Sequence, residues 1–291
     1  MEYHKDRFDD HSLLIFKNNA LMAVLPANKQ GRTLYSHQGL SYGGLVLSKE
    51  TKTTDVIEGF REVLSYLNSQ EIDMLELKKL PSIYNGAPSD EIDFIMYKLQ
   101  ASICRCDMTS AIHYDNPIQI TSSNRKRSLK RGLQHGLRIE QDQNFEGFWN
   151  HILIPNLKRR HDTDPTHSLS EINYLTNLFP NNIKQFNVYD KDVIVGGVTI
   201  FETDQVAHAQ YISANEQRQE LGTLDVLFDH VINYYAKSKA YFDFGVSSMN
   251  KGNAVNEGLM QWKESFGART VAHPVYEIET KHMDNLNAIM L

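Results

Sequence analysis

The stretch Val206–Arg269 constrains the fold more than any other part of the chain. It begins with a β-rich run, Val206–Ser213, and a polar loop then leads to Gly222. An amphipathic helical pattern follows, and the next run, Tyr241–Val246, has almost no polar alternation, as expected for a buried strand. A second helical pattern ends at Gly267, a residue type that commonly terminates helices. This order predicts an α/β fold, in which ligands bind where strand ends lead into helices.

The second half of this stretch resembles one protein family. It contains Asp243-Phe244-Gly245, then Gly258-Leu259, Trp262-Lys263-Glu264 and Phe266-Gly267. The order and spacing of these segments are similar to the DFG…GL…FKxxFG tail of FemAB-type transferases, which belong to the GNAT acyltransferase superfamily. The resemblance implies two tandem GNAT-like units. It is good over residues 120–280 and weaker over residues 1–115, where we find no motif.

The element pattern of the rest of the chain fits this plan. Residues 145–157 and 168–178 read as helices, and the second begins with a capping-box pattern. The first part of the chain also alternates strand and helix patterns. We therefore predict an α/β fold class (α+β mixed sheets). The resemblance divides it into an N-terminal GNAT-like domain, residues 1–120, and a C-terminal GNAT domain, residues 121–291, which carries the FemAB-like motifs.

Composition excludes several classes of protein. Of the 291 residues, 41% are hydrophobic and 23% are charged, as in globular proteins. The formal net charge of −6 argues against a protein that coats nucleic acid generally. The N-terminus lacks the apolar core of a signal peptide, and no run approaches the roughly 18 apolar residues that span a bilayer. Cys104 and Cys106 suit a reducing compartment as buried or reduced thiols, so we expect a cytoplasmic protein without a metal site.

One basic segment, Ser122–Arg138, contrasts with this acidic chain. Its cationic residues are Arg125, Lys126, Arg127, Lys130, Arg131 and Arg138. The segment reads as a helix with Leu129 and Leu133 facing inward. Its basic face is either simply solvated or binds phosphate, with Arg127 and Arg131 as candidate substrate-binding residues. Because the segment is short, a small phosphorylated ligand is favoured over tRNA.

A second candidate anion site lies at the start of the helix that follows Gly222. In the GNAT superfamily, a Q/R-x-x-G-x-G/A loop holds the pyrophosphate of acyl-CoA on backbone N–H groups. Here Gln219, Gly222 and Thr223 occupy that loop, Ser213 ends the preceding strand, and Leu224 stands where glycine or alanine is expected. The loop is either a pyrophosphate cradle or only a strand-to-helix turn. We expect no tightly bound cofactor, and acyl-CoA or another activated acyl donor as co-substrate.

Four residues are candidates for catalysis. In the FemAB-type tail, the lysine that corresponds to Lys263 is associated with stabilising the carbonyl oxygen during acyl transfer; otherwise Lys263 is an exposed helical lysine. Asp243 either orients or deprotonates an amine, or is a structural carboxylate. His208 and Gln210 share one face of their strand and Tyr211 the other. His208 is a candidate base and Tyr211 a candidate proton donor, although core packing explains both.

The polar loop between the two predicted helices of the second half is a candidate acceptor site. Its basic cluster and its histidines suit an acidic or phosphorylated acceptor, and the candidates are Arg159, Arg160, His161 and His167. The spacing of His161, Asp162 and His167 does not match the usual zinc motifs.

Taken together, the residues and the resemblance predict an acyltransferase. It moves an acyl or aminoacyl group to the primary amine of a small acceptor, such as an amino sugar or a cell-envelope precursor. The activated donor is linked to CoA, a carrier protein or tRNA. The alternatives are a non-catalytic GNAT-fold module that binds a phosphorylated ligand, and an aminoacyl-tRNA-dependent peptidyl transferase.

Overall fold

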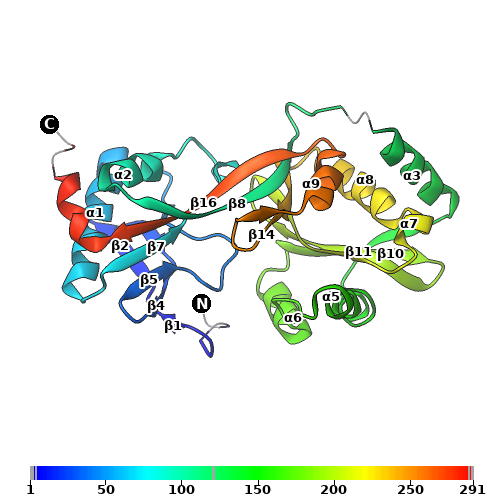
Figure 1. The fold of residues 1–291 in the computed structure, drawn as a ribbon, viewed down its shortest axis with the longest axis horizontal. Coiled ribbons are helices and arrows are strands. Elements are labelled where there is room, and N and C mark those ends of the chain that lie inside the picture. The colour runs from blue at the N-terminus through cyan, green and yellow to red at the C-terminus, as the bar shows by residue number, and fades with distance from the viewer. Residues whose placement is uncertain (1–2, 4, 120–121, 288, 290–291) are drawn as a thin grey trace. The chain divides into compact units, whose positions relative to one another are not determined.

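The computed structural model describes residues 3, 5–119, 122–287 and 289, and it contains two compact units (Figure 1). The first comprises residues 1–107, 248–254 and 272–291, and the second comprises residues 108–247 and 255–271. Strands β8 (Ser102–His113) and β16 (Arg269–Glu279) contribute residues to both units. The predicted boundary between residues 120 and 121 lies outside the described residues, and the division into domains 1–120 and 121–291 stays a prediction.

The first unit combines mixed-sheet strands with two helices. Its strand order is β1-β4-β5-β7-β16-β8, with β1 at Asp9–Asp10, β4 at Asn28–Gln30, β5 at Thr33–Ser36 and β7 at Met74–Lys78. The helices are α1 (Thr53–Ser69) and α2 (Glu91–Leu99). A three-stranded sheet contains β2 (Leu13–Lys17), β3 (Ala20–Leu25) and β6 (Val46–Leu47). The apolar faces of α1, α2 and β7 form one core with the strands around them.

The second unit contains the stretch that the sequence singled out. Its strand order is β8-β13-β12-β11-β10-β9, with β9 at Arg138–Asp142, β10 at Ile183–Asp190, β11 at Val193–Glu202, β12 at Val206–Ala214 and β13 at Tyr241–Val246. Strands β12 and β13 are parallel, and the neighbouring pairs are antiparallel. The short strands β14 (Ser248–Met249) and β15 (Ala254–Val255) follow.

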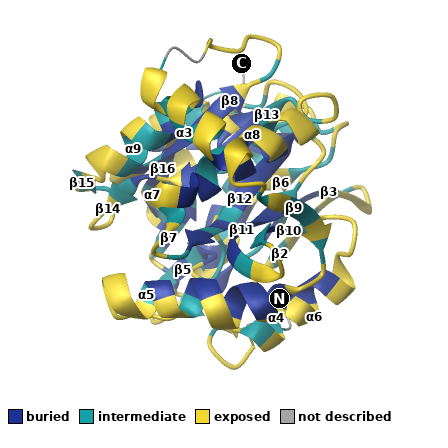
Figure 2. Cartoon of the chain, turned by 90° about the vertical axis from the view of Figure 1, so that its right-hand side faces the viewer, coloured by how far each residue is buried: buried dark blue, intermediate teal, exposed yellow. Residues whose placement is uncertain are grey.

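Helices cover both faces of the second unit's sheet (Figure 1). One face carries α3 (Ser123–Gln134), α7 (Arg218–Leu221), α8 (Thr223–Tyr235) and α9 (Glu257–Glu264). The other carries α4 (Phe145–Phe148), a π-helical turn at Trp149–Leu153, α5 (Ile154–His161) and α6 (Leu169–Leu178). Strands β10 to β13 are largely buried between helices whose outer faces are exposed (Figure 2).

Local sequence signals explain several of these elements. The predicted capping box of α6 is confirmed, because Ser168 and Glu171 exchange side-chain and backbone hydrogen bonds. Ser122 is the N-cap of helix α3, and its side chain accepts a hydrogen bond from the backbone N–H of Arg125. The predicted inward position of Leu133 is wrong: this side chain is exposed, and Gly132 is the residue that faces inward. No helix among the described residues is long and apolar enough to cross a membrane.

The two cysteines of β8 were predicted to be buried or reduced thiols. Cys104 and Cys106 are free thiols and both are exposed, so the buried alternative is wrong. They lie two residues apart on one strand, so alternation along it puts both side chains on one face. Burial therefore depended on the neighbouring elements, which the local sequence does not specify.

Candidate functional site

The candidate site lies where two parallel strands diverge. Strands β12 and β13 pair only over residues 206–208 and 241–243, although both strands continue beyond these positions. His208 and Asp243 are the last pair in register, so they lie where the two strands separate. Beyond this point β12 and β13 are no longer paired by backbone hydrogen bonds. Such a gap in a sheet gives a ligand access to backbone donors and acceptors.

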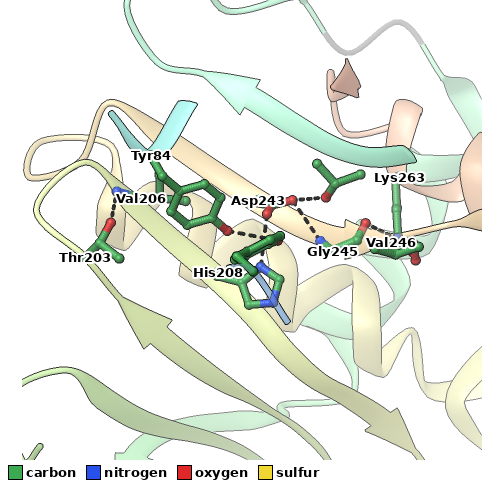
Figure 3. Close-up of polar contacts among 10 residues, drawn as sticks. Tyr84, Thr203, Val206, His208, Asp243, Gly245, Val246 and Lys263 are labelled. Carbon is green, nitrogen blue, oxygen red and sulfur yellow. Dashed lines mark hydrogen bonds and ion pairs between the residues drawn. The ribbon is translucent and has the colours of Figure 1, made fainter. Parts of the chain in front are cut away.

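A buried hydrogen-bonded cluster fills this point of divergence (Figure 3). His208 Nδ1 lies 3.0 Å from Asp243 Oδ2, and Asp243 is fully buried. The other carboxylate oxygen of Asp243 accepts hydrogen bonds from the Thr109 hydroxyl and, at 2.9 Å, from the Gly245 N–H. A carboxylate only accepts hydrogen bonds, so this pairing places the proton of the neutral imidazole on Nδ1 and the lone pair on Nε2.

Gly245 connects this pair to Lys263. Its carbonyl accepts a hydrogen bond of 2.7 Å from Lys263 Nζ, which also donates to the Val246 carbonyl at 2.9 Å (Figure 3). Gly245 has a φ of +75°, and a Cβ there would lie 3.3 Å from His208 Cε1. Glycine is therefore required both by the left-handed backbone and by the close imidazole ring.

Lys263 is not the exposed helical lysine that was the alternative to a catalytic role. Its side chain is 1% exposed, and it leaves α9 toward the end of β13. Burial lowers the pKa of the Lys263 ammonium to about 8, and the charge of Asp243 opposes this effect. The site therefore contains a buried cation at neutral pH, held by two main-chain carbonyls.

Tyr211 lies on the same face of β12 as His208, in contrast to the prediction. Thr199 of β11 pairs with Tyr211, and the next residue, Ile200, pairs with Ala209, so Gln210 forms a β-bulge. This extra residue shifts the alternation of side chains along the strand. Tyr211 accepts a 3.0 Å hydrogen bond from the backbone N–H of His167, and burial raises the pKa of its phenol to about 12.

His167 belongs to this packed cluster rather than to an open acceptor loop. It is buried, and its Nδ1 lies 2.6 Å from the Tyr211 hydroxyl. Its carbonyl accepts a hydrogen bond from the indole of Trp149, whose ring packs edge-on against Tyr211. These contacts fasten the polar loop to β12.

A cavity of about 1120 Å³ is bounded by α3, α5, α7, α8, α9 and the end of β12. The strand contributes residues 212–214, and α9 contributes Leu259 and Trp262. Its arginines are Arg125, Arg131, Arg160 and Arg218, and its carboxylates are Glu220 and Asp225. The lining thus combines an apolar wall with a formal excess of positive charge.

The predicted pyrophosphate loop is packed against α3. Gly222 and Thr223 are buried at the start of α8, where Gly222 has a φ of +66°. A Cβ on Gly222 would lie 2.6 Å from the Ser128 carbonyl oxygen of α3. A Cβ on Gly132 would lie 3.1 Å from the Gly222 carbonyl oxygen. The backbone of α3 therefore occupies the space beside this turn, whereas Gln219 and Ser213 do line the cavity.

Solved structures of known proteins share this architecture. FemX superposes with a TM-score of 0.66 at 10% sequence identity, covering 98% of this chain and 92% of FemX. A C-terminal domain assigned to a lysylphosphatidylglycerol synthetase from Agrobacterium fabrum gives a TM-score of 0.64 at 12% identity, with 97% and 87% covered. The fold of this chain is similar to that of FemX. L-PGS from Bacillus licheniformis is also similar, with a TM-score of 0.62 at 12% identity and 94% and 88% covered.

The FemAB-like tandem GNAT fold predicted from the sequence is therefore confirmed. No family model matches the chain, and no curated protein sequence matches it. At 10–12% identity, likeness to FemX and its neighbours establishes the fold. The chemistry must be argued from the residues of this chain.

Within the FemX-like fold, the predicted site residues fall into three groups. His208, Asp243 and Lys263 come together around Gly245. Arg131, Arg160, His161, Gln219 and Ser213 line the cavity. Arg127, Arg159, His167, Tyr211, Gly222 and Thr223 do not line it.

Sequence reasoning missed three residues that shape the site. Thr109 on β8 donates to Asp243, and Arg218 lines the cavity beside Arg160. Asn156 on α5 is buried and donates to Ser213 Oγ at 2.8 Å, which fixes the end of β12. A polar residue inside a helix pattern, such as Asn156, was the one available signal. Thr109 and Arg218 have no local signature.

Proposed function

We propose that this chain is a transferase that moves an acyl or aminoacyl group from an activated donor to an amine. One observation carries the proposal: the buried His208–Asp243 pair lies where β12 and β13 diverge, and Gly245 connects it to the ammonium of Lys263. A base, its orienting carboxylate and a buried cation are the groups that amine acylation requires. A neighbour named for making lysylphosphatidylglycerol also favours an acyl or aminoacyl group.

In this proposal His208 is the base and Asp243 is a positioning residue. Both carboxylate oxygens of Asp243 already accept hydrogen bonds, and the side chain is fully buried, so it is poorly placed to contact an amine. It instead holds Nδ1–H of His208, which keeps Nε2 basic and stabilises the imidazolium after proton transfer, as in a His–Asp pair.

The reaction then proceeds by direct attack. His208 Nε2 takes a proton from the acceptor amine while the amine nitrogen bonds to the carbonyl carbon of the donor. The resulting tetrahedral species collapses with cleavage of the bond between that carbon and the donor's leaving group. The leaving group accepts the proton from the imidazolium. No covalent enzyme intermediate is needed, and each proton is accounted for.

Lys263 supplies positive charge for the negative carbonyl oxygen of the tetrahedral species. Its pKa of about 8 keeps it mainly protonated at pH 7, and burial strengthens its field. Two of its N–H groups are used by the carbonyls of Gly245 and Val246, which hold the charge at the end of β13. The ammonium is thus fixed before the substrate binds, so little reorganisation is needed during the reaction.

The donor occupies the arginine-lined cavity, and the acceptor is a primary amine of a small molecule. The cavity borders residues 212–214 of β12, the strand that also carries His208. Amino sugars and cell-envelope precursors are the acceptor classes that we propose to test first. The donors to test are acyl-CoA, acyl-carrier protein and aminoacyl-tRNA.

The decisive experiment is a transfer assay with these donors and a panel of amines, read by mass spectrometry of the products. Once a reaction is found, we expect His208→Gln to lower its rate by about 10²–10⁴, the range of general-base catalysis. His230→Gln is the matched control, because His230 is exposed on α8. Full activity of the His208 variant would refute the assigned base. Absence of transfer from every donor would favour a binding module.

A further inference from the structure

Two arginines of the cavity lack a partner within the described part of the chain. Arg160 lies in the last turn of α5 and Arg218 begins α7, and both line the cavity. Neither guanidinium group forms a hydrogen bond or an ion pair with another described residue. Arginine normally uses its five N–H donors on carboxylates, phosphates or carbonyls, so a neighbouring pair without such acceptors indicates a ligand that provides them.

The other arginines in this region are already engaged. Arg125 donates to Asp225 and, at 2.8 Å, to Ser265, and its guanidinium carbon lies 4.1 Å from the Phe266 ring centroid. Arg159 pairs with a glutamate and donates to an asparagine. Arg125 connects α3 to α8 and to the end of α9, and Arg159 connects α5 to the loop before α7. Arg160 and Arg218 have no such structural contact.

The unpaired arginines also repel one another. Burial lowers the pKa of the Arg218 guanidinium, and the positive charges of Arg160 and Arg159 lower it further. Of these three, only Arg159 has a carboxylate partner. An anion between Arg160 and Arg218 would remove this repulsion and form charge-assisted hydrogen bonds.

The backbone N–H groups of the predicted pyrophosphate turn are the other candidate donors for a phosphate in this cavity. The predicted pyrophosphate turn at Gly222 and Thr223 is buried against α3, whose Ser128 carbonyl leaves no room for even a methyl group. This crowding beside Gly222 favours side chains over the turn as the groups that bind a phosphate in this cavity. Arg125 and Arg131 also line the cavity, but each donates hydrogen bonds to other side chains. Among the described residues that line the cavity, the guanidinium groups of Arg160 and Arg218 are therefore the arginine donors without a partner.

We propose that Arg160 and Arg218 form a phosphate subsite, and that the ligand is a small phosphate ester of nucleotide size. A cavity of about 1120 Å³ is close to the roughly 300–1,000 Å³ of small-molecule sites, and it is concave rather than a flat surface for RNA. This inference deepens the proposed function, on which it rests, by naming the class of donor. The phosphate belongs to the donor's carrier, so it stays with the leaving group.

The test measures binding, not activity, by calorimetry and native mass spectrometry of the full chain. Coenzyme A and 5′-AMP are compared with pantetheine and adenosine, which lack phosphate. We expect the phosphorylated probe of each pair to bind at least tenfold more tightly. Arg160→Gln and Arg218→Gln should each weaken only the phosphorylated probes, by about 10- to 100-fold, the value of charged hydrogen bonds.

Arg127→Gln is the matched control. Arg127 is exposed on α3, belongs to the basic segment and does not line the cavity. Its variant should bind every probe as the wild type does. Tryptophan fluorescence during unfolding checks that each variant is folded, and Arg160→Lys, which keeps the charge but not the planar fork, should retain part of the affinity.

Several results would overturn the subsite. Equal binding of phosphorylated and unphosphorylated probes, unchanged affinity in the double variant, or binding of bulk tRNA alone would each contradict it. The two proposals fail separately. Phosphate binding without any acyl transfer would contradict the proposed function but not the subsite. Transfer that is unaffected by Arg160→Gln and Arg218→Gln would contradict the subsite alone.

Discussion

Substitution of Lys263 by methionine tests whether a buried cation is built into this fold. In the folded chain the pKa of Lys263 falls from an ordinary 10.5 to about 8. Each pH unit of such a difference corresponds to about 1.4 kcal/mol, so the charged lysine costs about 3 kcal/mol of stability at pH 7. The unfolded chain keeps its proton up to a higher pH than the folded chain does. Stability from this group therefore rises as the pH increases from 8 to 10.5.

The measured quantity is the free energy of unfolding in denaturant at pH 7 and at pH 10. Both tryptophans, Trp149 and Trp262, belong to the second unit, so their fluorescence reports on the unit that contains Lys263. Subtracting the Lys263→Met curve from that of the wild type cancels the other titrating groups. This difference should shift by about 2 to 3 kcal/mol in favour of the wild type between the two pH values. Lys237→Met, at an exposed position, should show no shift.

One result would refute this reasoning. If the difference between wild type and Lys263→Met is the same at pH 7 and pH 10, Lys263 is not a buried cation with a depressed pKa. Its proposed role in stabilising a carbonyl oxygen would then lose its electrostatic basis. Loss of stability that is equal at both pH values would instead reflect the two carbonyls left without a donor.

Three further substitutions test other parts of the site. Asp243→Asn removes the charge that stabilises the His208 imidazolium, so it should lower the transfer rate by about 10²–10⁴. The thermal unfolding midpoint of the same protein preparation should change little. Gly132→Ala puts a methyl group 2.2 Å from a buried valine methyl and should cost about 1 to 3 kcal/mol in denaturant unfolding, whereas Gly86→Ala, with no atom within 4 Å, should be near neutral. Asn156→Ala leaves buried acceptors at the end of β12 unpaired and should cost about 1 to 3 kcal/mol by the same assay. An unchanged transfer rate for Asp243→Asn, or an unchanged unfolding free energy for Gly132→Ala or Asn156→Ala, would contradict the role that we assign to that residue.

The sequence predicted the second unit well because its signals are local. The alternation of β12, α8, β13 and α9 follows from the apolar spacing within Val206–Arg269, and the cap of α6 follows from four consecutive residues. Helix periodicity and capping depend on residues that are close in the chain, so they can be recognised from the sequence without knowledge of the tertiary structure. The FemAB-like motif then identified the strand and helix that carry Asp243 and Lys263.

Other features depend on contacts that are distant in sequence. The bulge at Gln210 exists because β11 and β12 pair with one extra residue, and it moves Tyr211 to the face of His208. Nothing in the alternation of β12 indicates it. Leu133 was placed inward by helical spacing, but Gly132 is the residue that allows α3 to approach the turn at Gly222. Close backbone approach selects glycine over a larger apolar side chain.

This close approach of α3 brings together the two candidate anion sites of the sequence, the basic segment and the loop at Gly222. A helix N-terminus binds phosphate through its N–H groups only when a ligand can reach them. At α8, Gly222 and Thr223 are buried, and Gly222 packs against α3, whereas Leu224 and Asp225 of the same turn line the cavity. In the proposed subsite the phosphate is therefore recognised by side chains of α5 and α7, where the guanidinium groups of Arg160 and Arg218 have no partner among the described residues. Side chains bind by charge and by bidentate geometry, and they tolerate more shapes of phosphate ester than a backbone cradle does. The donor preferences of this chain should therefore follow the number and position of phosphates rather than the identity of coenzyme A.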